Sequence, residues 1–214
     1  MLEEIKSKLL DSELVLRIDD HGAGSRIFSG KERKVKDLAK VSSSSLKTGR
    51  LLYRIARYLK PAVMVELGTS LGFGTICLAK GNPQGKIITI EGSPALAAFS
   101  KKQFTEYQLS NIEVVSGLFD EKLPALATKL PFPELVFIDG NHDHEPTLRY
   151  VDFFASRMRE GIIILDDIHW SENMHLAWQK ICSSEKTHVT IDLFQTGLIF
   201  PDKSITPGHY TIRF

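Results

Sequence analysis

The sequence predicts an α/β fold of the doubly wound, Rossmann-like type, in which helices cover both faces of a mostly parallel, seven-stranded sheet. From residue 62 onward, strand-like runs alternate with helical patterns, which is the order that a parallel sheet with crossover helices requires. The runs Val63–Leu67 and Ile162–Leu165 are nearly all apolar, as expected for strands covered on both faces. A glycine-rich loop follows the first of these runs.

The segment before this alternation predicts a small helical extension. Leu2–Leu16 and Leu46–Leu59 favour helices, and Lys31–Lys40 is basic and helix-prone. Asp19–Arg26 is polar and glycine-rich, which predicts a loop. Its glycines would let it close over a site as a lid, and an inert surface loop is the alternative. We therefore divide the chain into residues 1–60, the extension with its possible lid, and residues 61–214, the main domain.

The elements of the main domain follow from apolar runs and helical spacing. We predict strands at Val63–Leu67, Lys86–Glu91, Ile112–Ser116, Leu135–Asp139, Ile162–Leu165 and His188–Phe194. We predict helices near Thr75–Lys80, Pro94–Leu109, Lys122–Lys129, Glu145–Arg157 and Ser171–Ser183. The tail contains the strand-like segments Thr187–Phe194, Gly197–Phe200 and His209–Phe214 with no helix between them, so the sheet is expected to end in an antiparallel hairpin.

Composition narrows the functional classes. The 214 residues suit one ordinary globular domain, and 43% hydrophobic with 25% charged residues is average for such a domain. The formal net charge of +1 makes nucleic acid an unlikely partner, although Lys31–Lys40 could form a local basic face. No apolar run approaches the roughly 20 residues that cross a bilayer. The two cysteines, Cys77 and Cys182, indicate a reducing compartment, and we expect the cytoplasm.

The most informative motif is the loop after the first predicted strand of the main domain. It reads Glu-x-Gly-x-x-x-Gly-x-Gly, and neither register gives the Gly-x-Gly-x-x-Gly of dinucleotide binders. Glycine there permits positive φ angles and a ligand lying against bare main chain. The spacing favours a binder of S-adenosylmethionine (SAM) over a binder of NAD, and a plain tight turn is the alternative. The expected cofactor-binding residues of this loop are Glu66, Gly68, Thr69, Ser70, Gly72, Gly74 and Thr75.

Two further strand ends are candidates for nucleoside contacts, because ligands of open α/β sheets bind beyond the carboxyl ends of the strands. Glu91, followed by Gly92 and Ser93, could accept both ribose hydroxyls, or could be an ordinary surface carboxylate. The third strand end carries the small residues Ser116 and Gly117, which would let an adenine ring approach, and Leu118 or Phe119 could flank the ring. An ordinary strand-to-loop turn is the alternative.

The fourth and fifth strand ends carry a concentration of acids and histidines. Asp139 is followed by His142, and the adjacent pair Asp166 and Asp167 is followed by His169. Adjacent carboxylates repel unless a cation lies between them, so the three aspartates could bind a divalent ion such as Mg²⁺. The alternative assigns Asp166 or Asp167 to helix capping or a backbone hydrogen bond, with Asp139 contacting only the cofactor.

Histidine is the side chain best suited to proton transfer near neutral pH, so His142 or His169 could be a general base. His142 could also contact the cofactor together with Asp139, and Asp166 completes the set of candidate catalytic residues. Trp170 could line an apolar substrate pocket, and a packing role is the alternative.

Taken together, these residues resemble the class I SAM-dependent methyltransferases, over the region from Ala62 to the C-terminus. Glu66 through Gly74 is similar to the family's glycine-rich first motif, and Glu91 to its ribose-binding acid. The Asp-Gly-x-His loop resembles that of bacterial O-methyltransferases. In the metal-dependent enzymes of the catechol and caffeoyl-CoA type, the fifth strand ends in Asp-Asn, whereas this chain has Asp166 and Asp167.

The resemblance implies transfer of a methyl group from SAM to a small-molecule acceptor, most simply to a hydroxyl, with a divalent metal as a further option. It also implies that a homodimer is possible. Two alternatives stay open: a methyltransferase of an amine or a macromolecule, and a nucleoside-binding module without turnover.

Overall fold

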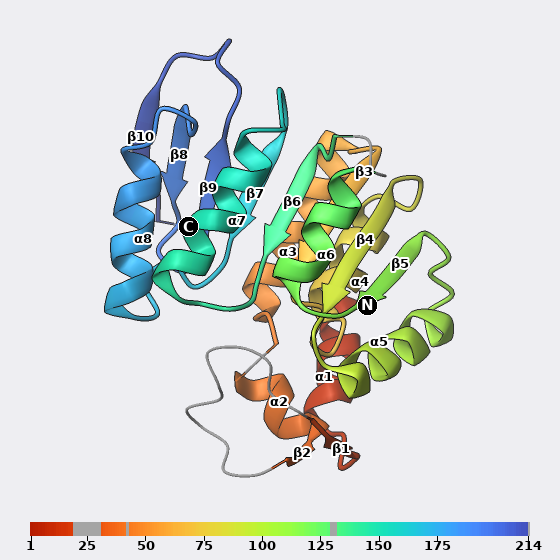
Figure 1. Ribbon diagram of the computed structural model, residues 1–214. Coiled ribbons are helices and arrows are strands. Elements are labelled where there is room, and N and C mark those ends of the chain that lie inside the picture. The colour runs from red at the N-terminus through yellow and green to blue at the C-terminus, as the bar shows by residue number, and fades with distance from the viewer. Residues whose placement is uncertain (19–30, 42, 129–131, 214) are drawn as a thin grey trace. The chain divides into compact units, whose positions relative to one another are not determined.

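The computed structural model describes residues 1–18, 31–41, 43–128 and 132–213. The predicted lid, Asp19–Arg26, lies outside these residues. The chain forms two compact units, and Figure 1 labels the elements of both. The first unit comprises Met1–Ala62 and Glu66–Leu130, and the second comprises Val63–Val65 and Pro131–Phe214. The predicted separation of residues 1–60 as an extension stays a prediction.

Both units contain helices and strands, and these alternate from Val63 to Asp192. The first unit contains α1 (Leu2–Leu10), β1 (Val15–Arg17), β2 (Glu32–Lys34), α2 (Val35–Val41), α3 (Leu46–Leu59), α4 (Phe73–Gly81), β4 (Lys86–Glu91), α5 (Pro94–Glu106), β5 (Ile112–Ser116) and α6 (Phe119–Ala127). Strand β3 (Val63–Leu67) begins in the second unit and ends in the first. The second unit continues with β6 (Leu135–Ile138), α7 (His144–Ala155), β7 (Ile162–Leu165), α8 (Glu172–Cys182), β8 (Val189–Asp192), β9 (Gly197–Phe200) and β10 (Gly208–Thr211).

The predicted α/β fold with a mostly parallel sheet is confirmed, with one strand more than expected. Among the described residues, eight strands pair in the order β10-β8-β9-β7-β6-β3-β4-β5. Strand β4 runs parallel to β5, and β6 runs parallel to β7. Strands β8 and β9 form the antiparallel hairpin expected at the end of the sheet. Strand β10 corresponds to the strand-like segment predicted at His209–Phe214; it pairs parallel with β8 and extends the sheet beyond the hairpin.

The prediction for the N-terminal segment was wrong in two places. The helix expected over Leu2–Leu16 ends at Leu10, because Val15–Arg17 pairs antiparallel with Glu32–Lys34. The segment Lys31–Lys40 accordingly splits into strand β2 and helix α2 rather than forming one helix. Both errors have one cause: a pairing between distant residues overrides the local helical preference.

A buried lysine anchors the N-terminal helix near the end of the glycine loop. Lys6 on α1 donates hydrogen bonds to the carbonyl oxygens of Ala39 and Ser44, each at 2.9 Å. Its ammonium also lies 5.0 Å from the centre of the Phe73 ring, the first residue of α4. A buried ammonium is tolerated only when acceptors surround it, so these contacts fix α1 against the residues that precede α3 and α4.

Helices α3 and α4 of the first unit pack closely because glycine stands where they meet. A Cβ atom at Gly49 would lie 2.6 Å from Phe73 Cε1, and one at Gly81 would lie 2.6 Å from the carbonyl oxygen of Tyr53. The side chains of α4 from Phe73 to Ala79 are all buried. This packing fixes the helix that follows the glycine loop.

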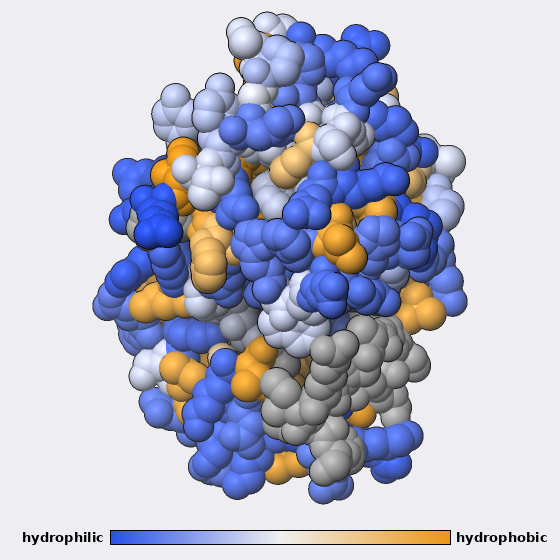
Figure 2. All heavy atoms as spheres, turned by 90° about the vertical axis from the view of Figure 1, so that its left-hand side faces the viewer, coloured by the Kyte–Doolittle hydropathy of each residue, from blue (hydrophilic) through white to orange (hydrophobic). Residues whose placement is uncertain are grey.

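In the second unit, strands β6 and β7 are buried along their whole length, as their apolar sequences predict. Figure 2 shows one face of the molecule, on which apolar side chains are scattered among polar ones. No helix within the described ranges has the length and apolar character needed to cross a membrane.

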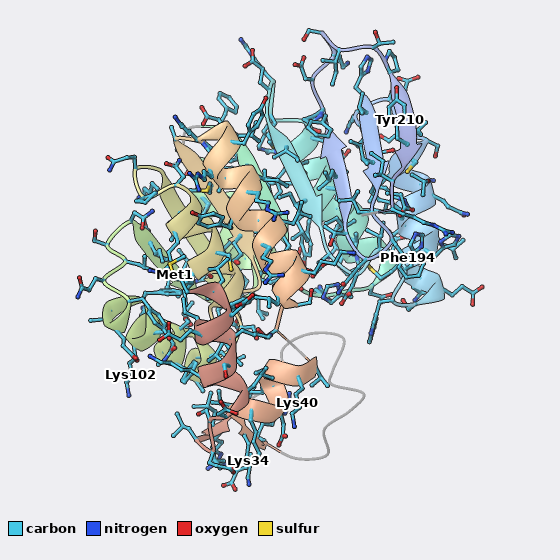
Figure 3. The ribbon with its side chains drawn as sticks, turned by 180° about the vertical axis from the view of Figure 1, so that it is seen from behind. Met1, Lys34, Lys40, Lys102, Phe194 and Tyr210 are labelled. Carbon is cyan, nitrogen blue, oxygen red and sulfur yellow. The ribbon has the colours of Figure 1, made fainter. Side chains whose placement is uncertain are left out.

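The basic segment before α2 is partly neutralised. Lys34 lies 2.9 Å from Glu13, and Lys36 also forms an ion pair with Glu13. Lys34 and Lys40 are labelled in Figure 3. Two of the lysines expected to form a basic face therefore share one carboxylate, which weakens that face as a binding site for nucleic acid.

Candidate functional site

The loop between β3 and α4 has the backbone geometry that its glycines predict, with one addition. Gly68 has φ 101° and Gly72 has φ 82°, both in the left-handed region. Ser70 also has a positive φ, 48°, although it is not glycine. Gly74 lies inside α4, so its backbone does not need positive φ. A Cβ at Gly72 would lie 2.8 Å from Phe104, which explains glycine there independently of any ligand.

Glu66 sits beneath this loop in a network of threonine hydroxyls. Its carboxylate is buried and accepts hydrogen bonds from Thr75 and, at 2.6 Å, from Thr89. Because the Thr89 hydroxyl donates to Glu66, it accepts from Thr69 at a separation of 2.6 Å. These contacts join the end of β3 to β4 and α4 through threonine hydroxyls.

Glu91 at the end of β4 bridges the glycine loop and the start of α5. One carboxylate oxygen accepts from the backbone N–H of Ser70 and the other from that of Ser93, both at 2.8 Å. Burial raises the pKa of Glu91, and the N–H groups of Ser93, Ser70 and Gly92 partly offset that rise. A buried carboxylate at this strand end is a strong acceptor suited to hydroxyl groups.

The third predicted cofactor-contact region, at the end of β5, is more exposed to solvent than the first two. Ser116 and Leu118 are exposed, and Gly117 has φ 138°. The Gly117 N–H donates to the carbonyl oxygen of Glu91 at 2.9 Å, so the end of β5 is held beside the end of β4. In the first unit, the structure thus brings the predicted residues at the ends of β3, β4 and β5 together through hydrogen bonds.

The second unit contains a cluster of acids around His142. His142 Nε2 lies 3.5 Å from an oxygen of Asp139 and 4.0 Å from an oxygen of Asp167. Within the part of the chain that the structure describes, its other ring nitrogen has no hydrogen-bond partner. The ring centre lies 6.2 Å from that of Trp170, whose side chain is half exposed. Residues predicted at two strand ends, Asp139 after β6 and Asp167 and Trp170 after β7, therefore lie around one imidazole.

The ionisable groups of this cluster shift one another's pKa values. Burial alone would lower the pKa of His142, but a hydrogen bond to Asp139 and the nearby Asp167 and Asp166 raise it above the ordinary value. Burial raises the pKa of Asp167, His142 opposes the rise, and Asp139 adds to it. Perturbed groups of this kind concentrate at functional sites.

Asp166 and Asp167 differ in environment although they are adjacent. Asp166 is buried and accepts a hydrogen bond from Thr196 at 2.9 Å. Burial, together with Asp139 and Asp167, raises its pKa to about 8. Asp167 has φ 57°, a left-handed conformation that is uncommon for a residue with a side chain. Neither caps α8, since Ser171 does so through the N–H of Met174.

The metal interpretation of the aspartates has evidence on both sides. Mutual repulsion among Asp139, Asp166 and Asp167 is what a divalent cation would relieve. However, in residues 1–18, 31–41, 43–128 and 132–213, no group of three or more His, Cys, Asp or Glu side chains has the arrangement of a metal site. The residues present therefore do not form a ready Mg²⁺ site.

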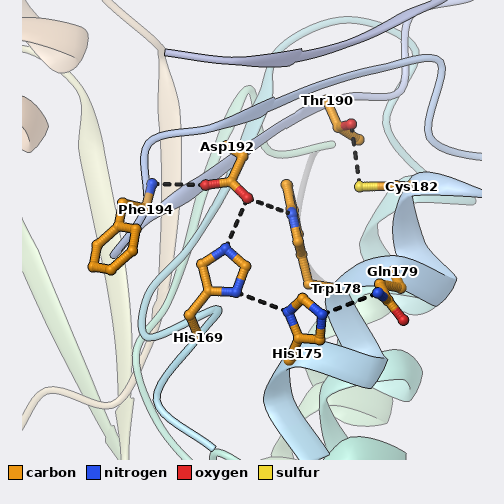
Figure 4. A network of polar contacts seen from close by, with 8 residues as sticks. All are labelled: His169, His175, Trp178, Gln179, Cys182, Thr190, Asp192 and Phe194. Atoms are coloured by element: carbon orange, nitrogen blue, oxygen red, sulfur yellow. Dashed lines mark hydrogen bonds and ion pairs between the residues drawn. The ribbon is translucent and has the colours of Figure 1, made fainter. Parts of the chain in front are cut away.

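His169 is engaged at both ring nitrogens (Figure 4). Its Nε2 lies 2.8 Å from Asp192, and its Nδ1 lies 2.9 Å from His175 Nδ1. Asp192 also accepts from Trp178 Nε1 at 3.2 Å and from the N–H of Phe194 at 2.7 Å. The prediction grouped His169 with His142, whereas hydrogen bonds join it to α8 and to the end of β8.

Sequence reasoning did not identify Asp192, Thr89 or Thr196. Asp192 ends β8, but the predicted strand ran on to Phe194, so the sequence placed Asp192 inside a strand and not at its end. Thr89 lies within β4 and Thr196 precedes β9, where nothing local marks either residue as a partner of a buried carboxylate.

The α/β sheet, the left-handed glycine loop and the acids at the strand ends agree with the resemblance to class I methyltransferases. Residues 65–168, just under half of the chain, match the sequence model of a protein family described as a methyltransferase domain. This part of the chain is therefore similar to a methyltransferase domain.

Individual relatives agree with this placement. The chain is 34% identical over 125 residues to a catechol O-methyltransferase of Mycobacterium tuberculosis, covering 58% of this chain and 55% of that protein. It is 30% identical over 128 residues to a catechol O-methyltransferase of Niastella koreensis, covering 58% and 57%. The chain thus spans little more than half the length of these curated relatives.

A solved structure shows the same fold. The O-methyltransferase from Bacillus cereus, in complex with S-adenosylhomocysteine (SAH), matches with a TM-score of 0.64 and 21% identity over 75% of this chain and 82% of that chain.

Proposed function

We propose that this protein transfers a methyl group from SAM to a hydroxyl group of a small molecule. The observation that carries this proposal is the placement of His142, whose Nε2 lies 3.5 Å from Asp139 and whose Nδ1 has no hydrogen-bond partner among the described residues. Removal of a hydroxyl proton needs such an imidazole, held by carboxylates and with one nitrogen able to accept.

The residues of the first unit fit a SAM-binding role. Left-handed backbone at Gly68, Ser70 and Gly72 shapes the turn that would pass beside the ligand. Each Glu91 carboxylate oxygen accepts one backbone N–H and keeps a lone pair for a hydroxyl group. Glu66 supports the loop from below through Thr75. When bound, SAM supplies a methyl group that is already activated by a sulfonium. The further contacts that we propose are Thr69, Gly74, Gly92, Ser93, Ser116, Gly117, Leu118, Asp139 and His142.

His142 is the better candidate for the base. It would take the hydroxyl proton at Nδ1 while Asp139 and Asp167 stabilise the imidazolium that results. His169, by contrast, has hydrogen bonds at both nitrogens. Because a base must be neutral to accept a proton, turnover should rise with pH through the raised pKa of His142, above 6.5, and then level off.

Mg²⁺ is not required in this proposal, because the aspartates lack the arrangement of a metal site within the described ranges. We route no step through a metal. Turnover of enzyme treated with EDTA should equal that of enzyme supplied with Mg²⁺. A loss of activity in EDTA that Mg²⁺ restores would show that Asp139, Asp166 and Asp167 gather around an ion.

The decisive experiment combines SAM titration by calorimetry with an acceptor panel of phenols, catechols and amines, read out as SAH. We expect SAM binding and turnover with a hydroxyl acceptor. His142→Gln should reduce turnover by about 10²–10⁴-fold, the usual contribution of a general base. The matched control is His144→Gln, which should keep parent turnover because the His144 ring pairs with the exposed Glu145 and lies outside the proposed site.

Other outcomes would select the alternatives. Turnover with amines alone would favour an amine methyltransferase. SAM binding without turnover on any acceptor would favour a nucleoside-binding module. We also propose a cytoplasmic location, supported by free Cys77 and Cys182, and a homodimer, which sedimentation would test.

A further inference from the structure

The second histidine cluster has a geometry that the methyl-transfer proposal does not use. His169 follows β7 and His175 lies on the first turns of α8. Their Nδ1 atoms lie 2.9 Å apart, with ring centres separated by 5.1 Å (Figure 4). Two imidazole nitrogens can be this close only if one donates a proton to the other or if both bind the same cation.

The outer nitrogen of His169 is held by a fixed acceptor. Asp192 accepts from His169 Nε2, from Trp178 Nε1 and from the N–H of Phe194. A carboxylate can only accept, so His169 Nε2 must carry the hydrogen. In the neutral ring the lone pair is then on Nδ1, directed at His175.

The outer nitrogen of His175 faces a side chain that can adapt. Gln179 lies one turn further along α8, with its amide nitrogen 2.9 Å from His175 Nε2. Rotation of the amide by half a turn places its oxygen there, so that His175 Nε2 can donate. The lone pair of His175 Nδ1 then points at His169, and the two lone pairs converge.

We infer that His169 and His175 form a binding site for a borderline transition metal ion, Ni²⁺ or Cu²⁺. Two ligand nitrogens at about 2.1 Å from an ion and at right angles to each other lie about 3.0 Å apart, close to the observed separation and the usual arrangement for Cu²⁺ and Ni²⁺. A tetrahedral ion such as Zn²⁺ would need a separation of about 3.4 Å from the same bond lengths. Water completes the coordination.

The surroundings match those of metal-bound histidines. Such a ring usually donates its second N–H to a carboxylate or carbonyl, which orients the ring and makes it a better ligand. Asp192 does this for His169, and the Gln179 oxygen can do so for His175. His175 is exposed, which gives an ion a path from solvent. The site is separate from the three aspartates, since hard Mg²⁺ prefers oxygen ligands.

The test is equilibrium dialysis and calorimetry of the untagged, metal-stripped protein with NiCl₂. We expect one Ni²⁺ per chain, not displaced by a large excess of Mg²⁺. His175→Gln should weaken binding at least tenfold, and Asp192→Asn about 10–100-fold through loss of ring orientation. His144→Gln, a histidine of the same unit outside the cluster, should bind as the parent does. X-ray absorption of the parent complex should show two imidazole ligands.

Either of two results would overturn the inference: no Ni²⁺ uptake by the parent, or parent-like affinity in His175→Gln. His175 is exposed, so this variant is expected to fold, and circular dichroism checks that it does. The measurement does not depend on methyl transfer, so loss of the proposed function and loss of the metal site are separately observable.

Discussion

Asp166→Asn should stabilise the protein at alkaline pH, because the native carboxyl is buried beside two other acids. Burial and the charges of Asp139 and Asp167 raise the pKa of Asp166 from 3.8 to about 8. Below pH 3.8 it is protonated in both the folded and unfolded states. As the pH rises from 3.8 to 8, only the unfolded state ionises, so the folded protein loses stability across this window.

The size of the stability change follows from the pKa shift of Asp166. Each pKa unit corresponds to about 1.4 kcal/mol, so the interval from 3.8 to about 8 amounts to about 6 kcal/mol. Asp166 titrates together with neighbouring acids, so the interval does not belong to Asp166 alone. We therefore expect Asn at this position to recover about 3 kcal/mol above pH 8, roughly half of the full interval. Its side-chain oxygen can still accept from Thr196.

Urea titrations at pH 4, 6 and 8.5 in EDTA measure how the unfolding free energy depends on pH. The unfolding free energy of the parent should fall with pH more steeply than that of the Asp166→Asn variant. The control is Asp152→Asn, an exposed aspartate paired with Lys186, which should keep the slope of the parent. Equal slopes for the parent and the Asp166→Asn variant would refute the reasoning.

Three further predictions concern the first unit. Lys6→Met removes the donor to two buried carbonyl oxygens, so the unfolding free energy measured in urea should fall by about 2–3 kcal/mol; an unchanged value would contradict the anchoring role of Lys6. Gly49→Ala places a methyl group 2.6 Å from the Phe73 ring and should cost about 1–3 kcal/mol in the same assay, whereas a neutral result would show that the helices can separate freely. Glu91→Gln turns an amide N–H toward the N–H of Ser70 and should weaken SAM binding at least tenfold in calorimetry; parent affinity would mean that the ribose is held elsewhere.

The strands of the sheet were predictable because their sequences carry the signal themselves. Val63–Leu67 and Ile162–Leu165 are apolar runs ended by polar residues, and the structure gives them the predicted bounds. The two-stranded sheet of β1 and β2 was not predictable in the same way. Each of its strands has three residues, and only their pairing across the intervening segment stabilises them.

The candidate site was predictable in position and less so in detail. The acids at the strand ends could be found because parallel strands deliver their carboxyl ends to one edge of a sheet. The hydrogen-bond partners of these acids could not be predicted from the sequence. The positive φ of Ser70 and the hydroxyls around Glu66 depend on neighbours that only the folded chain supplies.

The two candidate bases show most clearly what the fold adds to the sequence. His142 and His169 both follow a strand end and stand near carboxylates, so the sequence cannot separate them. The structure separates them by the use of their nitrogens. His169 donates to Asp192 and meets His175 on its other side, which suits an ion shared between two rings. His142 has carboxylates only at Nε2, which leaves a nitrogen for the proton of a substrate. Substitution of His142 should therefore reduce turnover with no effect on Ni²⁺ binding, and substitution of His175 should do the reverse.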